Sequence, residues 1–189
     1  MAKTVLYRLS KFKDLSLFPT GPVDTSFENL IKDGIVLTLN DEANAKLMQI
    51  LAEIMIVKLH AIVKRGDQPR VLRRMLVFDE AWRIAKSQRL VDLGREGRAF
   101  GVGIVIGTQR PKDIPESLLS CLRTQIYLFN TEIEDQKIIV RALCNTTTGA
   151  TADRLFKSIK NLEKFEGYII SDQYKQGTRV NVKPHHERA

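Results

Sequence analysis

No glycine in this 189-residue chain is followed by lysine. The phosphate-binding loop G-x-x-x-x-G-K-S/T therefore fits no position in the sequence. The two cysteines, Cys121 and Cys144, are far apart, lack C-x-x-C spacing and have no histidine-rich stretch beside them. Because this pattern gives neither a disulfide framework nor a zinc site, it favours a reducing compartment.

Long apolar runs are also missing. No run approaches the roughly 20 residues that span a bilayer. Near the amino terminus, lysine and arginine are scattered among apolar residues, without the continuous hydrophobic stretch and small-residue cleavage site of a signal peptide. We therefore expect a soluble, cytoplasmic protein.

The composition, with 43% hydrophobic and 28% charged residues, is that of one ordinary globular core. A formal charge of +8 favours a polyanionic partner, although a basic surface can also simply aid solubility. Because aromatic residues do not interleave with the basic ones, contacts to a phosphate backbone are favoured over base stacking. The loose basic cluster contains Lys64, Arg65, Arg70, Arg73 and Arg74.

Apolar patterns alternate between strand and helix type. Residues 35–39, 75–78 and 102–107 predict buried strands, and the apolar residues of 47–63 recur at helical spacing after a possible cap at Asn40 or Asp41. A helical pattern through 82–93 separates the last two strands. This order predicts an α/β fold with a largely parallel sheet, in which 75–78 is a central strand covered on both faces.

The remainder of the chain continues this alternation. Helices are expected over about 115–121, 132–143 and 151–159, with a strand at 125–129. Residues 167–171 and 178–183 predict a carboxyl-terminal antiparallel hairpin, because the second segment alternates polar and apolar residues. We expect residues 1–34 to form a poorly defined segment, 35–183 the main domain and 184–189 a loose tail.

Two acids follow the strand at 75–78. A carboxylate at a strand end, here Asp79, can hold a water of a hydrated magnesium ion, and Glu80 is offset to orient an attacking water. The plainer alternative is that the pair caps the following helix, where acids favour the helix dipole. Because a second apolar strand ends in Thr108-Gln109, we favour the catalytic interpretation.

Three further side chains suit the same chemistry. The amide of Gln109 can accept from a water and donate to a γ-phosphate oxygen, although it can also satisfy backbone groups at a strand end. Arg98 and Arg95 precede the Gln109 strand. An arginine there can reach across an interface to a neighbour's nucleotide, although such residues commonly form a solvated helix face.

These motifs resemble the HerA/FtsK superfamily of DNA-pumping ATPases, and the HerA branch most. The resemblance implies a RecA-like core that binds ATP and Mg²⁺ between the subunits of a hexameric ring around double-stranded DNA. It makes Asp79 and Glu80 the Walker B pair, Gln109 the sensor, and Arg98 the trans-acting arginine with Arg95 second. It also implies a NurA-type nuclease as partner. The matching segments are Leu76–Arg83, Arg95–Gly103, Gly107–Pro111 and Asp113–Pro115.

The sequence departs from the family in having no Walker A strand, loop and helix and no N-terminal barrel. Without those amides and that lysine, affinity for ATP should collapse. We therefore expect the carboxyl-terminal part of a HerA-like DNA translocase or helicase, in which the RecA-like sheet is incomplete. The chain alone should hydrolyse ATP negligibly. Two alternatives are a non-catalytic DNA-binding module and an assembly module that completes an ATPase site in trans.

Overall fold

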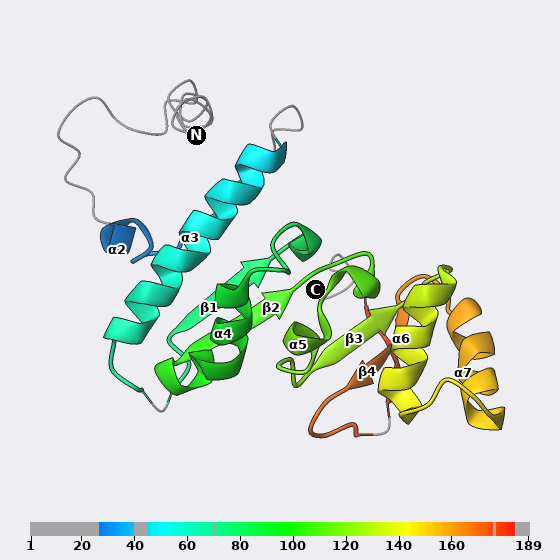
Figure 1. The fold of residues 1–189 in the computed structure, drawn as a ribbon. Coiled ribbons are helices and arrows are strands. Elements are labelled where there is room, and N and C mark those ends of the chain that lie inside the picture. Colours follow the sequence, from blue (N-terminus) through cyan, green and yellow to red (C-terminus); the bar gives the residue numbers. More distant parts are fainter. Residues whose placement is uncertain (1–26, 40–44, 70, 176, 184–189) are drawn as a thin grey trace. The chain divides into compact units, whose positions relative to one another are not determined.

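The computed structural model describes residues 27–39, 45–69, 71–175 and 177–183. The chain divides into two compact units, Met1–Gly66 and Asp67–Ala189 (Figure 1). Each unit is described by itself.

The first unit contains the longest helix. α2 spans Phe27–Leu30, and α3 spans Ala45–Arg65 as the apolar spacing predicts. Basic residues in the last turn of α3 complement the helix dipole, and Gly66 follows with its N–H donating to the carbonyl of Val63 at 3.2 Å. The predicted cap at residues 40–41 lies outside the described residues. No helix of the described segments combines the length and hydropathy that crossing a membrane requires.

The strand predicted at residues 35–39 is wrong. The segment is irregular, and the side chain of Val36 is 94% exposed. A β-branched run forms a strand only where a neighbouring strand receives its backbone N–H and C=O groups and its side chains pack on a sheet. Among the described residues, none supplies that partner strand.

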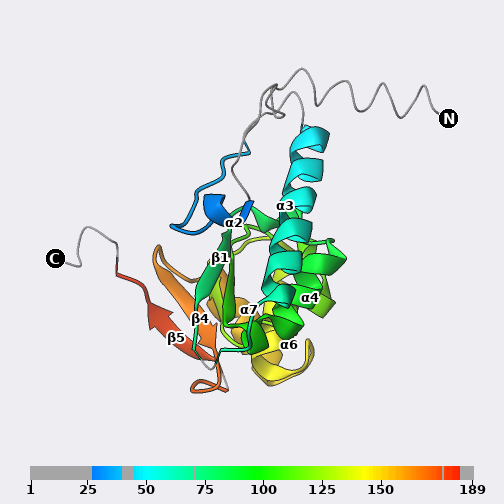
Figure 2. The ribbon, with the colours of Figure 1, turned by 90° about the vertical axis from the view of Figure 1, so that its left-hand side faces the viewer.

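The second unit holds two small sheets. β1 (Arg74–Phe78) pairs in parallel with β2 (Val102–Ile106), with Arg74 opposite Val102 and Phe78 opposite Ile106. β3 (Gln125–Leu128) runs antiparallel to β4 (Glu166–Ile170), which pairs with β5 (Thr178–Asn181). Figure 2 shows β4 and β5 side by side. The predicted α/β class and the antiparallel carboxyl-terminal hairpin are confirmed.

The connection from β1 to β2 is not one helix, as the pattern through 82–93 had suggested. A 3₁₀ turn, η2 (Ala81–Arg83), comes first, and α4 (Gln88–Glu96) begins only after Ser87. The hydroxyl of Ser87 accepts from the N–H of Leu90 at 3.4 Å, which caps α4. A second 3₁₀ turn, η3 (Gly97–Phe100), then leads into β2, against which α4 packs.

One face of the parallel pair is less covered than the sequence predicts. Met75 and Val77 on β1 are 51% and 67% exposed, and Val105 on β2 is 47% exposed. These residues share a face because alternate side chains of a strand point the same way. The prediction of a central strand covered on both faces is therefore wrong for the described part of the chain.

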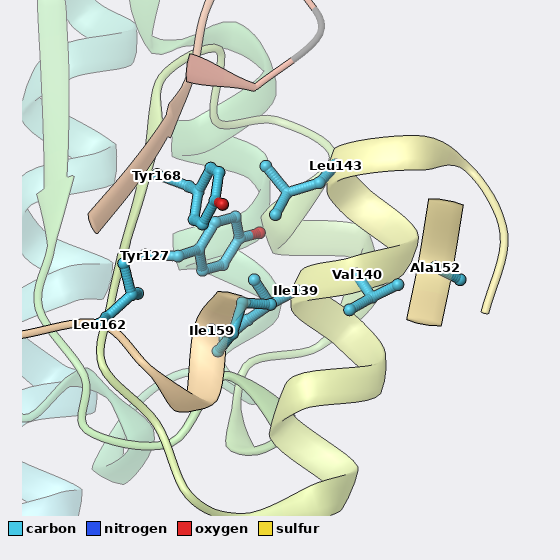
Figure 3. Close-up of a cluster of buried hydrophobic side chains, with 8 residues drawn as sticks. All are labelled: Tyr127, Ile139, Val140, Leu143, Ala152, Ile159, Leu162 and Tyr168. Carbon is cyan, nitrogen blue, oxygen red and sulfur yellow. The ribbon is translucent and has the colours of Figure 1, made fainter. Parts of the chain in front are cut away.

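A second core lies beside the antiparallel sheet. After η4 (Pro111–Asp113) and α5 (Glu116–Leu119), the helices α6 (Ile133–Cys144) and α7 (Ala150–Lys160) pack on each other. Figure 3 shows the rings of Tyr127 and Tyr168 next to Leu143 and Ile139 of α6. Burial raises the pKa of Tyr127 to about 12. This core fixes the position of the α6 amino terminus, which contacts η4.

Candidate active site

The ladder between β1 and β2 is interrupted where both strands end. The N–H of Gly107 donates to the carbonyl of Phe78 at 2.8 Å, and the carbonyl of Gly107 accepts from the N–H of Ala81 at 3.0 Å. Asp79 and Glu80 lie between these two bonds, so Gly107, the residue that follows β2, bonds to the chain on both sides of them. This bulge-like arrangement turns the two acids out of the sheet at its carboxyl edge.

The backbone of Glu80 is left-handed, with φ 50° and ψ 43°. For a residue with a Cβ this conformation costs roughly 1–2 kcal/mol. Such strain persists only where neighbouring contacts determine the geometry, and it gathers at functional sites. One local contact is the N–H of Glu80, which donates to Oδ1 of Asp79 at 3.0 Å.

Glu80 meets the end of the other strand through its side chain. Nε2 of Gln109 donates to Oε1 of Glu80 at 2.6 Å, and Nε1 of Trp82 donates to Oε2 at 2.8 Å. Both carboxylate oxygens are thus held by neutral donors. The structure therefore brings together Glu80 and Gln109, which the sequence places 29 residues apart.

A pocket of about 610 Å³ opens beside this contact. Its lining combines two acids, three cations, one amide and one indole. Among the lining residues, Arg110 pairs with Asp113 at 3.6 Å, and Nζ of Lys112 lies 3.3 Å from Oε1 of Glu132. The lining residues are Glu80, Trp82, Lys86, Gln109, Arg110, Lys112 and Asp113.

Asp79 is exposed and faces a glycine. A Cβ added at Gly107 would lie 3.1 Å from Oδ1 of Asp79, so a side chain there would crowd the carboxylate. Within the described residues, no three His, Cys, Asp or Glu side chains gather as a metal cluster. Magnesium commonly uses one or two carboxylates together with water and substrate phosphates, so a single exposed Asp79 fits a hydrated Mg²⁺.

Arg95 and Arg98 lie at the opposite end of the parallel pair. Both are exposed, Arg95 in the last turn of α4 and Arg98 in η3, just before β2 begins. β2 has five residues, so its two ends are about 13 Å apart. Neither arginine can touch Glu80 of the same chain. The structure therefore does not bring either arginine to the Glu80–Gln109 contact of its own chain.

Two contacts of the site have no signature in the sequence. The indole N–H of Trp82 donates to the carboxylate of Glu80. Asp135, in the first turn of α6, accepts from the backbone N–H of Lys112 at 2.8 Å and is fully buried. An acid in the first turn of a helix is common for dipole reasons, so its pattern alone could not reveal this contact.

Sequence comparison relates the chain to DNA helicases. It is 32% identical over 90 residues to the DNA double-strand break repair helicase HerA of Sulfolobus acidocaldarius. The match covers 48% of this chain and 17% of that protein, so the chain spans less than a fifth of this relative. No family model matches the chain.

Comparison with solved structures shows which fold the chain has. The bacterial conjugative coupling protein TrwBdeltaN70 aligns with a TM-score of 0.62 at 16% identity, covering 76% of this chain and 39% of that one. The genome packaging NTPase B204 of Sulfolobus turreted icosahedral virus 2, in complex with ATP-gammaS, aligns with a TM-score of 0.53 at 16% identity, covering 87% and 74%. The chain therefore has the fold of RecA-like P-loop ATPases, and about half of its sequence is similar to HerA helicases.

Proposed function

We propose that this chain supplies the water-activating half of an ATP hydrolysis site in a HerA-like, ATP-driven DNA translocase or helicase. The observation that carries the proposal is the 2.6 Å contact between Glu80 and Gln109 at the carboxyl edge of the parallel pair. In open α/β sheets, ligands bind outside the carboxyl ends of the strands. A carboxylate and an amide that meet there can both face one nucleotide.

Each side chain has a distinct part in this proposal. Glu80 accepts a hydrogen bond from the attacking water and orients it, because phosphoryl transfer depends mainly on positioning and charge stabilisation. Gln109 can donate to the γ-phosphate, and its amide oxygen can accept from the same water. Asp79 would hold Mg²⁺ through a coordinated water. The bound ion would neutralise charge on the phosphate oxygens.

The phosphate-binding half comes from a segment that carries the glycine-lysine loop. That loop supplies most of the backbone N–H contacts to the phosphates. Arg98, with Arg95 as second candidate, acts on the nucleotide of a neighbouring subunit, since both lie at the far end of β2. The assembly is then an oligomer, for which we propose a hexameric ring.

Double-stranded DNA is the proposed substrate. The chain carries a formal charge of +8, and the relative from Sulfolobus acidocaldarius is named a DNA double-strand break repair helicase. Basic surfaces attract nucleic acid mainly through the phosphate backbone. A NurA-type nuclease is the proposed protein partner.

Hydrolysis in a reconstituted mixture tests the proposal. The tagged chain is purified alone and also recovered from its source cells with any bound polypeptide that carries G-x-x-x-x-G-K-S/T. Mg-ATP turnover is then measured for the chain, the polypeptide and the mixture, with Glu80→Gln as the matched isostere. We expect turnover in the mixture and a loss of at least about 100-fold with Glu80→Gln, because general base and positioning contributions have this size.

Two results would overturn parts of this proposal. Equal turnover of the mixture with wild-type chain and Glu80→Gln would remove Glu80 from the chemistry. Turnover by the chain alone, abolished by Glu80→Gln, would keep the site but contradict the need for a second segment.

A DNA-binding module that works without nucleotide is the second candidate, and the basic charge favours it. Such a module binds duplex DNA with a steep dependence on salt. Substituting Asp79→Ala separates the candidates. Nucleotide-dependent DNA binding that needs Asp79 favours the motor, whereas salt-dependent binding that ignores both nucleotide and Asp79 favours the module.

A further inference from the structure

Asp135 is a buried carboxylate outside the pocket. Its side chain is fully buried in the first turn of α6, and Oδ1 accepts from the backbone N–H of Lys112 at 2.8 Å. Oδ2 has no hydrogen-bond partner among the described residues. Burying a carboxylate with so few partners is costly, so a residue of this kind calls for an explanation beyond packing.

The side-chain hydrogen bond of Asp135 to Lys112 reaches the segment that carries Gln109. Lys112 lies three residues after Gln109, within η4 (Pro111–Asp113), and η4 packs against α6. The side chain of Lys112 also reaches this helix end, where Nζ lies 3.3 Å from Oε1 of Glu132. The amino terminus of α6 therefore holds both the main chain and the side chain of Lys112.

Gln109 lies between two fixed points of the backbone. On one side Gly107 is bonded to Phe78 and Ala81. On the other side Lys112 is bonded to Asp135. Between them the hydroxyl of Thr108 accepts from the N–H of Arg110 at 3.3 Å, a contact local to the loop that fixes nothing to a helix or sheet.

We propose that Asp135 is a positioning residue that holds the amide of Gln109 against Glu80. Oδ1 fixes the backbone at Lys112, so the loop from Gly107 to Lys112 keeps one path. The positive end of the α6 dipole favours a carboxylate in the first turn, which offsets part of the cost of its burial. The catalytic meaning of this role rests on the proposed function, whereas the geometry does not.

Trp82 makes the proposal measurable in the chain alone. It is the only tryptophan in the sequence, and its Nε1–H donates to the carboxylate that Gln109 contacts. Its indole N–H therefore gives one resolved signal in a ¹H–¹⁵N correlation spectrum. A change in the Glu80–Gln109 contact alters the hydrogen bond of this proton and moves the signal.

The experiment compares five variants of the full chain. Gln109→Ala defines the signal position when the amide is lost. Asp135→Leu removes the acceptor for Lys112 but fills the volume, and Asp135→Asn keeps an acceptor oxygen. Glu134→Ala is the control, because this neighbour is exposed, forms an ion pair with Lys137 at 2.8 Å and makes no hydrogen bond to the backbone of Lys112 among the described contacts. The double variant Asp135→Leu with Gln109→Ala completes a cycle.

We expect the indole signal of Asp135→Leu to move in the same direction as that of Gln109→Ala. Asp135→Asn and Glu134→Ala should leave it in place. The double variant should move it no further than Gln109→Ala does, because Asp135 acts through Gln109. General loosening of α6 would instead produce an additive shift.

Three results would overturn the proposal: an unmoved signal in Asp135→Leu, an additive shift in the double variant, or an Asp135→Asn signal that follows Asp135→Leu. If Asp135→Leu does not fold, Asp135→Asn and Asp135→Ser decide, since only Asn retains the carbonyl acceptor at that reach. None of these spectra uses nucleotide. Failure of the proposed ATPase role would therefore show only in the hydrolysis measurements.

Discussion

The amide of Gln109 donates to the carboxylate of Glu80 across 2.6 Å, from the ends of two parallel strands. The backbone of Glu80 is left-handed at this contact, its N–H donates to Asp79, and its carboxylate also accepts from Trp82. The site therefore depends on one unusual backbone conformation as much as on the identity of the acids.

Replacing Glu80 by glycine or alanine separates strain from chemistry. Both variants lose the carboxylate, but only glycine adopts a positive φ without steric cost. We expect Glu80→Gly to be more stable than Glu80→Ala by about 1 kcal/mol, measured by urea unfolding. The same pair at Glu134, in the first turn of α6, should show the opposite order, because glycine weakens a helix by about 1 kcal/mol. If alanine were the more stable variant at both positions, the strain at Glu80 would be contradicted.

Substituting Gly107 can displace the carboxylate of Asp79 while Asp79 itself stays unchanged in the sequence. A methyl group there would lie 3.1 Å from Oδ1 of Asp79, so the carboxylate must shift by a few tenths of an ångström. For Gly107→Ala in the reconstituted mixture, we expect the Mg²⁺ concentration for half-maximal hydrolysis to rise about 10-fold, the size of effect seen when groups around a metal ligand are disturbed. Gly66→Ala, where a methyl group makes only ordinary contact at 3.5 Å, is the control and should leave it unchanged.

The elements that follow from apolar periodicity could be predicted from the sequence. α3, β1, β2 and the β4–β5 hairpin all lie close to the predicted ranges, because long helical spacing and strict alternation are strong local signals. The predicted strand at 35–39 failed because strand formation depends on a partner. The predicted burial of Met75 and Val77 failed for the same reason, since burial depends on what packs against a face.

The candidate site was predictable only in part. Strand ends in parallel sheets meet at one edge, so the proximity of Glu80 and Gln109 follows from the order of elements. The left-handed turn at Glu80, the indole contact of Trp82 and the anchor at Asp135 do not. Each depends on a backbone path or a tertiary contact that no residue spacing encodes.

The second core gives a pH-dependent prediction. Burial raises the pKa of Tyr127 from 10.0 to about 12, so its phenol stays neutral in the folded state after the unfolded chain begins to ionise. The stability that Tyr127 adds is therefore present below pH 10 and is lost as the pH rises toward 12. We expect the unfolding free energy of the wild type relative to that of Tyr127→Phe to stay constant from about pH 7 to 9. Above about pH 10 the wild type should lose stability relative to Tyr127→Phe. A constant difference through pH 12 would contradict the burial effect.

Arg98 provides the sharpest test of assembly, because it lies before the start of β2, whereas the acid pair of its own chain lies at the carboxyl end of the parallel pair. If it acts on a neighbour, Arg98→Ala and Glu80→Gln should each abolish hydrolysis in the reconstituted mixture. Combining the two inactive chains should then restore it, since some interfaces join an intact Glu80 to an intact Arg98. Random mixing in a closed ring makes on the order of one quarter of the interfaces complete.

The recovery of hydrolysis should therefore be partial. A chain that carries both substitutions should show no recovery, because none of its interfaces joins an intact Glu80 to an intact Arg98. Repeating the measurement with Arg95→Ala asks which arginine is responsible, because both are exposed at the same end of β2. Absence of recovery at every mixing ratio, with each variant folded and assembled, would mean that neither arginine completes a neighbouring site. The charge on the transferred phosphate would then have to be stabilised by cations of the phosphate-binding segment and by the bound Mg²⁺, with the amide of Gln109 as a further donor.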